Sequence, residues 1–343
     1  MKKYIVAVVG ASGAVGEEIF RVLEECKFPV ARIVPLASKR SVSKEIEFDS
    51  QTYKIQETTH EIFAKENVEI AFFSAGGKVS AEFAPSAVRA GAVVIDNTSH
   101  FRMDSDVPLV VPEVNAEDIK EWRKKGIIAN PNCSTIQMVQ ILAPLHKVFG
   151  IKRVDVSTYQ AASGAGKRGM EELVMQMQAF FAFKLDEAAA EVFPHRLAFN
   201  VIPHIDVFMP NDYTKEEMKM INETHKIMHV SFPVSATCVR VPVLRSHSES
   251  VTIVFEKKVD VKKIRELLVQ SSNVVLCDDP ERKLYPMPSF ASETDQTYVG
   301  RIRADNFDKH IVHLWCVADQ IRVGAATNAV RIAQKWIEMQ ENK

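Results

Sequence analysis

A strand followed at once by a glycine-rich turn and a helix opens this chain, and it constrains the fold more than any other feature. Residues 4–9 (YIVAVV) are continuously apolar and β-prone, which is typical of a strand buried on both faces. Glycines follow at positions 10, 13 and 16, and apolar residues then recur at helical spacing. Such a turn lets the backbone approach a pyrophosphate, which the N–H groups at the helix N-terminus can bind. The pattern predicts a dinucleotide-binding domain.

The end of the next predicted strand, residues 33–37, indicates which nucleotide would bind. An acidic side chain there would hold the ribose 2′-OH of NAD, but the chain has Ser38-Lys39-Arg40-Ser41 instead. Cations and hydroxyls suit a 2′-phosphate, so this loop favours NADP as the cofactor. A solvated basic loop is the alternative interpretation.

Strand and helix patterns go on alternating through the first third of the chain. Strands are predicted at residues 68–73, 92–96, 109–111 and 127–129, and helices at residues 79–90 and 116–124. This alternation predicts an α/β fold with a Rossmann-type, mostly parallel, doubly wound sheet over residues 1–130.

The pattern of apolar and polar residues changes from residue 151 onward. Residues 154–159, 237–241 and 250–255 alternate apolar and polar side chains with period two, and few helices separate them. We therefore predict a second, α+β domain over residues 131–318, built on a larger mixed or antiparallel sheet. A helical pattern at residues 328–340 predicts that the C-terminal segment, about 319–343, returns to pack on the first domain.

Composition excludes several classes of protein. The 343 residues carry a formal net charge of −1, so nothing indicates binding to nucleic acid or to an anionic membrane. The N-terminal apolar run is broken by glycines and passes into Glu17-Glu18, which argues against a signal peptide. The five cysteines are widely spaced and form no C-x-x-C pair, so neither a zinc site nor a disulfide framework is indicated. We expect a cytoplasmic protein without a metal site.

Cys133 lies where a strand ends and a helix begins. The apolar residues 127–129 precede it, and a helical stripe follows over residues 134–149. Backbone N–H groups at a helix N-terminus stabilise a thiolate and lower the pKa of a cysteine. Taken alone, the position fits a nucleophile and a small buried side chain equally well.

Three later residues could serve a nucleophilic cysteine. Gln160 opens a glycine-containing loop, residues 160–166, and its amide could bind a carbonyl or acyl group. Arg240 would point off a strand and could hold a carboxylate, and His247 follows in a predicted loop where an imidazole could move protons. The simpler interpretations are a loop amide bonded to its own backbone and a structural or exposed histidine.

Charged residues elsewhere have both a functional and a structural interpretation. Arg102 follows a strand and could meet an anionic substrate or lie on the surface. Thr214 and Glu217 form a capping box at the start of a helix, so Glu217 has a structural role. Glu216 and Lys219 share one face of that helix and could bind an ammonium group and an anion, although a surface ion pair is the default.

Six motifs, in this order along the chain, resemble those of the aspartate-semialdehyde dehydrogenase family. The resemblance runs essentially from end to end. Any one motif is weak evidence, but their co-occurrence is specific. The motifs are residues 10–16 (GASGAVG), residues 130–135 (NPNCST), Gln160 with residues 163–166 (SGAG), Glu216 with Lys219, residues 240–243 (RVPV) with His247, and Asp319-Gln320.

The resemblance implies a reaction and an assembly. The reaction is the NADPH-dependent reductive dephosphorylation of L-aspartyl 4-phosphate to L-aspartate 4-semialdehyde through an acyl-thioester on Cys133. It belongs to the synthesis of lysine, methionine, threonine and isoleucine, and of diaminopimelate in bacteria. The second domain would then be the catalytic and dimerisation domain, and the protein a homodimer or a tetramer.

The resemblance also implies residue roles. Cys133 would be the nucleophile, His247 the acid/base and Gln160 the residue that orients the acyl group. The substrate carboxylate would bind Arg240, its ammonium group Glu216, and the phosphate Arg102 and Lys219. The implied NADP-binding residues are Gly10, Ser12, Gly13, Ala14, Val15, Arg40, Ser41, Ser163, Gly164 and Gln320.

Three alternatives remain open at this point. A related acyl-phosphate reductase, such as N-acetyl-glutamyl-phosphate reductase, would use the same cysteine chemistry. A glyceraldehyde-phosphate dehydrogenase would be expected to have a histidine soon after Cys133, and residues 134–139 contain none. A non-catalytic nucleotide sensor would have no need of the set formed by Cys133, Gln160, Arg240 and His247.

Overall fold

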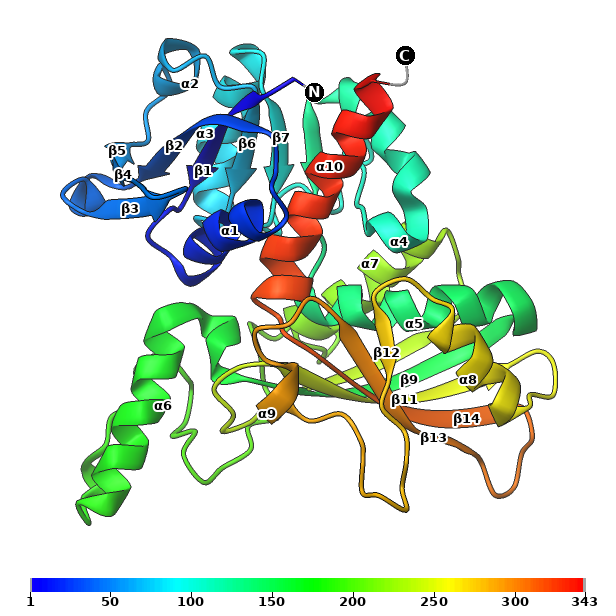
Figure 1. Ribbon diagram of the computed structural model, residues 1–343. Helices are drawn as coiled ribbons and strands as arrows, with labels where there is room; N and C mark the ends of the chain where they lie inside the picture. The colour runs from blue at the N-terminus through cyan, green and yellow to red at the C-terminus, as the bar shows by residue number, and fades with distance from the viewer. Residues whose placement is uncertain (1, 342–343) are drawn as a thin grey trace. The chain divides into compact units, whose positions relative to one another are not determined.

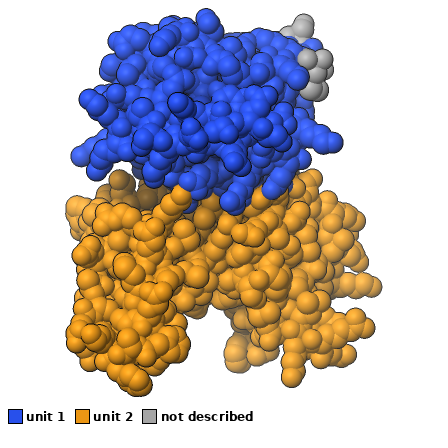
Figure 2. Space-filling model, turned by 60° about the vertical axis from the view of Figure 1, so that its left-hand side comes forward, with its two compact units in different colours: residues 1–132, 325–343 blue, residues 133–324 orange. Residues whose placement is uncertain are grey.

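The computed structural model describes residues 2–341 and divides the chain into two compact units (Figures 1 and 2). Unit 1 comprises Met1–Asn132 and Ala325–Lys343, and unit 2 comprises Cys133–Gly324. Both boundaries lie slightly later than the sequence predicts, by two residues and by six. Cys133 begins a helix of unit 2, and the segment from Asp319 is hydrogen-bonded to other parts of unit 2, so both belong there.

Unit 1 is built on a six-stranded, all-parallel sheet in the order β5-β2-β1-β6-β7-β8. Its central strands are almost wholly buried, as the continuous apolar run in residues 4–9 predicts. The chain leaves β1 toward β2 and later returns to β6 on the other side, so the carboxyl end of β1 is the topological switch point. The strands are β1 (Tyr4–Val9), β2 (Val30–Ala37), β5 (Gln56–Glu57), β6 (Ile70–Phe73), β7 (Val93–Asp96) and β8 (Ile127–Ala129).

Helices and a small hairpin complete unit 1. The C-terminal helix α10 packs into the same apolar core as α1 and the sheet, with Val330, Ala333, Trp336 and Ile337 buried. The C-terminal segment from Ala325 onward therefore belongs to unit 1. The remaining elements are α1 (Ala14–Glu25), the 3-10 helix η1 (Lys39–Ser41), β3 (Glu45–Phe48), β4 (Gln51–Lys54), α2 (Ile62–Lys65), α3 (Gly77–Arg89), α4 (Pro112–Asn115), the 3-10 helix η2 (Ala116–Lys124) and α10 (Thr327–Glu341).

Two element predictions in unit 1 were wrong. Residues 109–111 form only an isolated bridge, between Leu109 and Ala129. The Asn115 side chain accepts from the Val111 N–H and donates to the Leu109 carbonyl, which occupies groups that a longer ladder would need. Residues 116–124 are a 3-10 helix rather than an α-helix; only Ile119 of this segment is buried, so little tertiary packing stabilises an α-helix there.

Unit 2 contains a second six-stranded sheet, in the order β10-β9-β11-β14-β13-β12, which confirms the predicted mixed sheet. The β9–β10 and β12–β13 pairs are parallel, and the other three pairs are antiparallel. Helices α5, α7 and α8 share an apolar core with this sheet. The strands are β9 (Ile151–Gln160), β10 (Val234–Arg240), β11 (His247–Phe255), β12 (Val274–Leu276), β13 (Thr297–Ala304) and β14 (Ile311–Ala318).

Several helices of unit 2, among them α6 and α8, were not predicted from the sequence. Residues 160–166 do not form an open glycine loop, because the 3-10 helix η3 (Ala162–Ala165) follows β9 and leads directly into α6. The Thr214–Glu217 capping box is confirmed. The helices are α5 (Cys133–Phe149), α6 (Gly166–Phe181), η4 (Leu185–Glu187), α7 (Lys215–Met228), α8 (Val261–Val269), α9 (Pro288–Ala291) and the π-helix η5 (Arg322–Ala326), which runs past the boundary into unit 1.

No helix within residues 2–341 has both the length and the apolar character that crossing a membrane requires.

Candidate active site

The predicted site residues fall into both units. Unit 1 holds eight of them: Gly10, Ser12, Gly13, Ala14, Val15, Arg40, Ser41 and Arg102. Unit 2 holds nine: Cys133, Gln160, Ser163, Gly164, Glu216, Lys219, Arg240, His247 and Gln320. Each group is described within its own unit.

Three of the predicted site residues lie together at one edge of the unit 2 sheet, where strands begin or end. Gln160 and Arg240 are the last residues of the parallel strands β9 and β10 and are register partners. His247 is the first residue of the antiparallel strand β11, where it pairs with Ala318 at the end of β14. The prediction that His247 lies in a loop was therefore wrong. Strand direction, rather than closeness in sequence, brings these side chains to one place.

Cys133 is the first residue of α5, as the strand-to-helix pattern predicts, and it is half-buried. Its thiol therefore lies where the unsatisfied N–H groups of the helix favour a negative charge. A Cβ built on Gly324 would lie only 2.4 Å from the Cys133 Cβ, so the backbone of residue 324 packs directly on the cysteine. Sequence reasoning did not find Gly324, because the contact joins residues far apart in the chain.

Gln160 links the neighbour of the cysteine to Glu216 on helix α7. Its Nε2 donates to the Ser134 Oγ at 2.9 Å and to the Glu216 Oε1 at 3.3 Å. The amide is buried and held from two sides, so its orientation is fixed. Ser134 is a second residue that the sequence did not single out.

The backbone of Ala161 connects Arg240 to His247. The Arg240 guanidinium donates to the Ala161 carbonyl at 2.6 Å, and the Ala161 N–H donates to the His247 Nδ1 at 3.0 Å. A Cβ on Gly164 would lie 2.7 Å from the Arg240 Nη1 and 3.3 Å from the His247 Nε2. Glycine at this position therefore lets the η3 turn lie against both side chains.

His247 is held as a neutral imidazole of one tautomer. Because Nδ1 accepts a hydrogen bond, the ring proton is on Nε2. Burial, followed by the positive charge of Arg240, lowers the pKa of His247 to about 3. The Nε2 atom is buried and has no hydrogen-bond partner in the described part of the chain. His247 can therefore donate one hydrogen bond from Nε2 near neutral pH.

Lys219 lies between two carboxylates. Its Nζ is 2.9 Å from the Glu216 Oε2 and 2.8 Å from the Asp206 Oδ2. Burial alone would lower the pKa of Lys219, but the two carboxylates outweigh burial and the pKa is raised. Sequence reasoning missed Asp206, since it lies in a different segment. The three groups carry one positive and two negative charges, which favours binding of an ammonium group.

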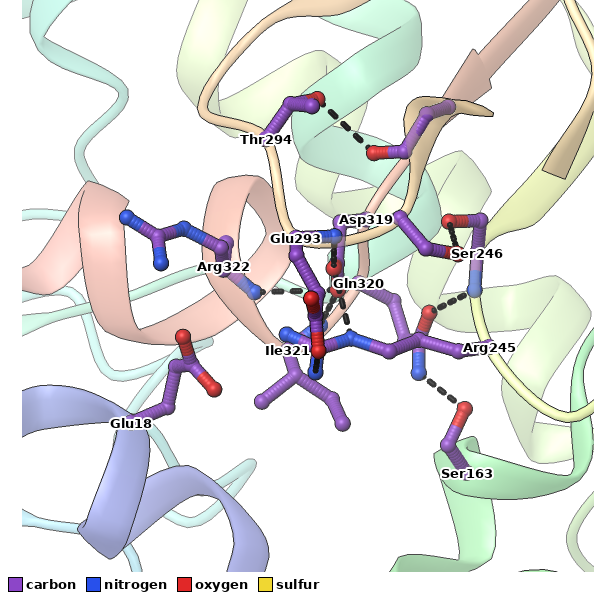
Figure 3. Close-up of polar contacts among 12 residues, drawn as sticks. Glu18, Ser163, Arg245, Ser246, Glu293, Thr294, Asp319, Gln320, Ile321 and Arg322 are labelled. Atoms are coloured by element: carbon purple, nitrogen blue, oxygen red, sulfur yellow. Dashed lines mark hydrogen bonds and ion pairs between the residues drawn. The ribbon is translucent and has the colours of Figure 1, made fainter. Parts of the chain in front are cut away.

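Asp319 organises the segment that carries Gln320 (Figure 3). Its Oδ2 accepts from the Arg245 Nε and from the Glu293 N–H, each at 2.6 Å, and its Oδ1 accepts from the Ile321 N–H at 2.9 Å. The carboxylate thus joins three separate stretches of unit 2. It fixes the start of the turn that ends at the glycine packed on Cys133.

Gln320 is itself held by hydrogen bonds at both ends of its amide. Its Oε1 accepts from the Ser246 N–H at 2.7 Å, and its Nε2 donates to the Ser163 Oγ. Two of the predicted cofactor residues of this unit, Ser163 and Gln320, are therefore in direct contact.

The glycine turn of unit 1 has the shape that close approach to an anion needs. Gly10 has a φ of +95°, a conformation that favours glycine. A Cβ on Gly16 would lie 2.1 Å from the Gly10 carbonyl oxygen, so glycine is required for the helix to pack this closely. Ser12 donates to the Ser41 Oγ at 3.2 Å, which joins the turns after β1 and β2. Arg40 is exposed on η1 beside this pair.

Arg102 is buried in unit 1 and oriented by the backbone. Its Nε donates to the Asn130 carbonyl at 2.9 Å and its Nη2 to the Asn97 carbonyl at 2.8 Å. The side-chain oxygen and nitrogen of Asn97 are buried without hydrogen-bond partners among the described residues. Sequence reasoning did not single out Asn97, and no local pattern marks it.

Comparison with known proteins gives consistent relatives along the whole chain. Family models for the semialdehyde dehydrogenase NAD binding domain and for the semialdehyde dehydrogenase dimerisation domain match residues 5–122 and 142–323. The chain is 67% identical to an aspartate-semialdehyde dehydrogenase of Campylobacter jejuni over 98% of both chains. It is 57% identical to one of Helicobacter pylori over 98% of this chain and 99% of that protein.

Solved structures agree with these relatives. Aspartate semialdehyde dehydrogenase II from Vibrio cholerae, complexed with ASA, superposes with a TM-score of 0.95 at 46% identity, over 98% of this chain and 99% of that one. The Candida albicans aspartate semialdehyde dehydrogenase with NADP gives a TM-score of 0.73 at 25% identity, over 98% and 99% of the two chains.

Proposed function

This chain belongs to the aspartate-semialdehyde dehydrogenase family, and on that premise we propose that it reduces L-aspartyl 4-phosphate to L-aspartate 4-semialdehyde with NADPH, releasing phosphate. It would do so as a cytoplasmic homodimer in the aspartate pathway of amino-acid biosynthesis. The observation that carries the proposal is the edge of the unit 2 sheet where Gln160, Arg240 and His247 meet. Gln160 also binds Ser134, the neighbour of the helix-terminal Cys133.

The thiolate of Cys133 is stabilised without a dedicated base. The start of α5 favours negative charge, and Arg240 is close enough for the charge of Cys133 to affect it: burial lowers the pKa of Arg240, while Glu216 and Cys133 oppose that shift. His247 carries its proton on Nε2, so it can donate a hydrogen bond to an oxygen that gains negative charge.

The reaction proceeds in two displacements. The Cys133 sulfur attacks the acyl carbon of aspartyl phosphate, the C–S bond forms, and the C–O bond to phosphate breaks. NADPH, when bound, supplies the hydride that the acyl carbon receives. The oxygen that gains negative charge accepts a hydrogen bond from the His247 Nε2–H; the C=O bond then re-forms from this oxyanion as the C–S bond breaks, which releases the aldehyde and the thiolate.

Substrate binding follows from the charges. Arg240 binds the α-carboxylate and Glu216 the ammonium group, while Gln160 orients the acyl group. Lys219 is already balanced by two carboxylates, so we expect its contribution to phosphate binding to be small. In unit 1, the glycine turn fits a pyrophosphate and the exposed Arg40 with Ser41 fits a 2′-phosphate.

The test is phosphate-dependent formation of NADPH from aspartate semialdehyde and NADP by the purified chain. We expect activity with this substrate and none with N-acetyl-glutamate semialdehyde. Cys133→Ala should abolish turnover but keep NADP binding, and Cys26→Ala, at an exposed cysteine of unit 1, should keep both. Near-normal turnover by Cys133→Ala would disprove the thioester mechanism, and a preference for the N-acetylated substrate would disprove the substrate assignment.

A further inference from the structure

A second ionisable group lies inside unit 2 next to the proposed machinery and has no role in the mechanism above. Glu249 is fully buried on β11, two residues after His247 and therefore on the same face of the strand. Its register partners are Thr158 on β9 and Cys316 on β14. A buried carboxyl without an evident partner needs a physical explanation.

The contacts of Glu249 lead to the helix that carries Cys133. The Cys316 Sγ lies 3.4 Å from the Glu249 Oε2, and the Gln137 Nε2 lies 3.7 Å from the same sulfur. Gln137 is four residues after Cys133 on α5, so the two side chains share one face of the helix. A polar cluster of Gln137, Cys316 and Glu249 thus joins α5 to β11 and β14, one helical turn after Cys133 and two residues after His247.

Within the described residues, no basic group opposes the rise in the pKa of Glu249. The Cys316 thiol on β14 is the titratable group that acts on Glu249, and Glu249 in turn raises the pKa of Cys238 on β10; burial also raises the pKa of both thiols. α5 and β9 present the uncharged Gln137 and Thr158. Burial raises the pKa of the Glu249 carboxyl to about 8, and hydrogen bonds from Cys316 and Gln137 oppose that rise only in part.

The buried oxygens on and around Glu249 that lack a hydrogen-bond partner are consistent with a protonated carboxyl group. The Glu249 Oε1, the Gln137 Oε1 and the Thr158 Oγ1 are all buried without a partner among the described residues. Two of these oxygens can only accept. A proton on the Glu249 Oε1 supplies a donor to this set, whereas an ionised Glu249 adds an unpaired charge to it.

We propose that Glu249 is a positioning residue that acts as a neutral carboxylic acid, tying the Gln137 turn of α5 to β11 so that Cys133 stays aligned with His247. The proposal rests on the proposed function for its catalytic consequence. Ionisation of Glu249 would place an uncompensated charge in the interior between β11 and α5, and the rearrangement that relieves this charge would slow the chemical step. Because the folded-state pKa lies above the ordinary 4.5, the stabilising contribution of the proton is complete below about pH 4.5 and is lost as pH rises through about 8.

Glu249→Gln keeps the size and the hydrogen bonds of the side chain but cannot ionise, whereas Glu249→Leu removes the hydrogen bonds. Glutamine keeps a neutral donor and acceptor, so kcat should stay near the wild-type value at neutral pH. The wild-type kcat should decline as pH rises through about 8, and the Glu249→Gln kcat should not decline there. Leucine removes the hydrogen bonds and should lower kcat by about tenfold or more, with KM little changed. Glu172→Gln, at a buried glutamate of the same unit that accepts three backbone N–H groups, is the matched control and should keep the wild-type alkaline profile.

Infrared difference spectroscopy provides a readout that does not need activity. The wild type at neutral pH should show a protonated-carboxyl band that is absent from Glu249→Gln and present in Glu172→Gln. Absence of that band from the wild type, or identical alkaline profiles of the wild type and Glu249→Gln, would overturn the proposal. A wild type that shows the band but fails to reduce aspartyl phosphate would refute the proposed function and leave the neutral Glu249 intact.

Discussion

The candidate sites of the two units consist of different kinds of groups. In unit 1 the site is backbone: a glycine turn, the N-terminus of α1, and Arg102 bound to two carbonyls. In unit 2 the site is made of buried side chains at the ends of strands, with His247, Arg240 and Gln160 all nearly inaccessible. A backbone site should be damaged by adding atoms, and a side-chain site by removing them.

Two buried carboxyl groups, one in each unit, also differ in how they are hydrogen-bonded. Burial raises the pKa of Asp96 in unit 1, but three hydrogen bonds from Ser80 and Thr98 oppose that rise. Glu249 in unit 2 is hydrogen-bonded to a thiol and an amide, and neither carries a charge. Unit 1 therefore satisfies its buried charge locally, while unit 2 keeps reactive and imperfectly paired groups together, as catalysis requires.

The largest expected effect is the removal of a side chain from unit 2. Arg240→Ala should lower kcat/KM by about a thousandfold, because truncating one partner of a buried charged pair costs about 2–5 kcal/mol. The measurement is steady-state kinetics with aspartate semialdehyde as the varied substrate. Arg240→Lys keeps the charge without the planar fork and should lie between alanine and wild type. A loss below tenfold in the alanine variant would show that the unit 2 site does not depend on this side chain.

Adding one methyl group to unit 1 should have the next largest effect. Gly16→Ala places a Cβ 2.1 Å from the Gly10 carbonyl oxygen, so the turn must open. We expect a loss of about 1–3 kcal/mol in the free energy of unfolding and weakened NADP binding, measured by denaturant titration and by calorimetry.

Gly13→Ala is the matched control for this change. Its Cβ would lie 3.3 Å from the same carbonyl oxygen, so a smaller shift accommodates it. Equal losses in Gly13→Ala and Gly16→Ala would show that the close approach in this turn is not what stabilises it.

The smallest expected effect is on cofactor choice in unit 1. Arg40→Ala should raise the Kd for NADP by roughly tenfold, the effect of one exposed charge-assisted contact of about 1.4 kcal/mol, and leave the Kd for NAD unchanged. Parallel titrations of the two nucleotides measure this difference. Lys39→Ala tests whether any nearby positive charge has the same effect. Equal weakening of both nucleotides by Arg40→Ala would rule out a 2′-phosphate contact.

Local patterns predict the parts of the molecule that local forces determine. The buried strand β1 and the glycine turn after it follow from apolar runs and glycine spacing. The start of α5 at Cys133 and the Thr214–Glu217 capping box follow in the same way from residues close in sequence. These features need few contacts with distant residues, so the sequence alone indicates them.

The features that sequence reasoning missed depend on distant contacts. Helix α6 begins in a glycine-containing stretch, and its Glu172 and Gln176 hold the backbone of residues 189–198 through hydrogen bonds. Gly324 matters only because it packs on Cys133, and Asp206 because it binds Lys219. His247 becomes buried through the pairing of β11 with β14. None of these leaves a periodic or local signature.

The contribution of α10 to the core of unit 1 has a consequence for biosynthesis. Chains grow from the N-terminus at about 5–20 residues per second, so β1 emerges long before the helix that covers its sheet. Unit 2 is continuous from residue 133 to residue 324 and has all its strands before α10 is made. The nucleotide-binding unit is therefore begun first and completed last. During synthesis its apolar sheet face lacks α10, and apolar surface exposed in this way favours aggregation of the nascent chain.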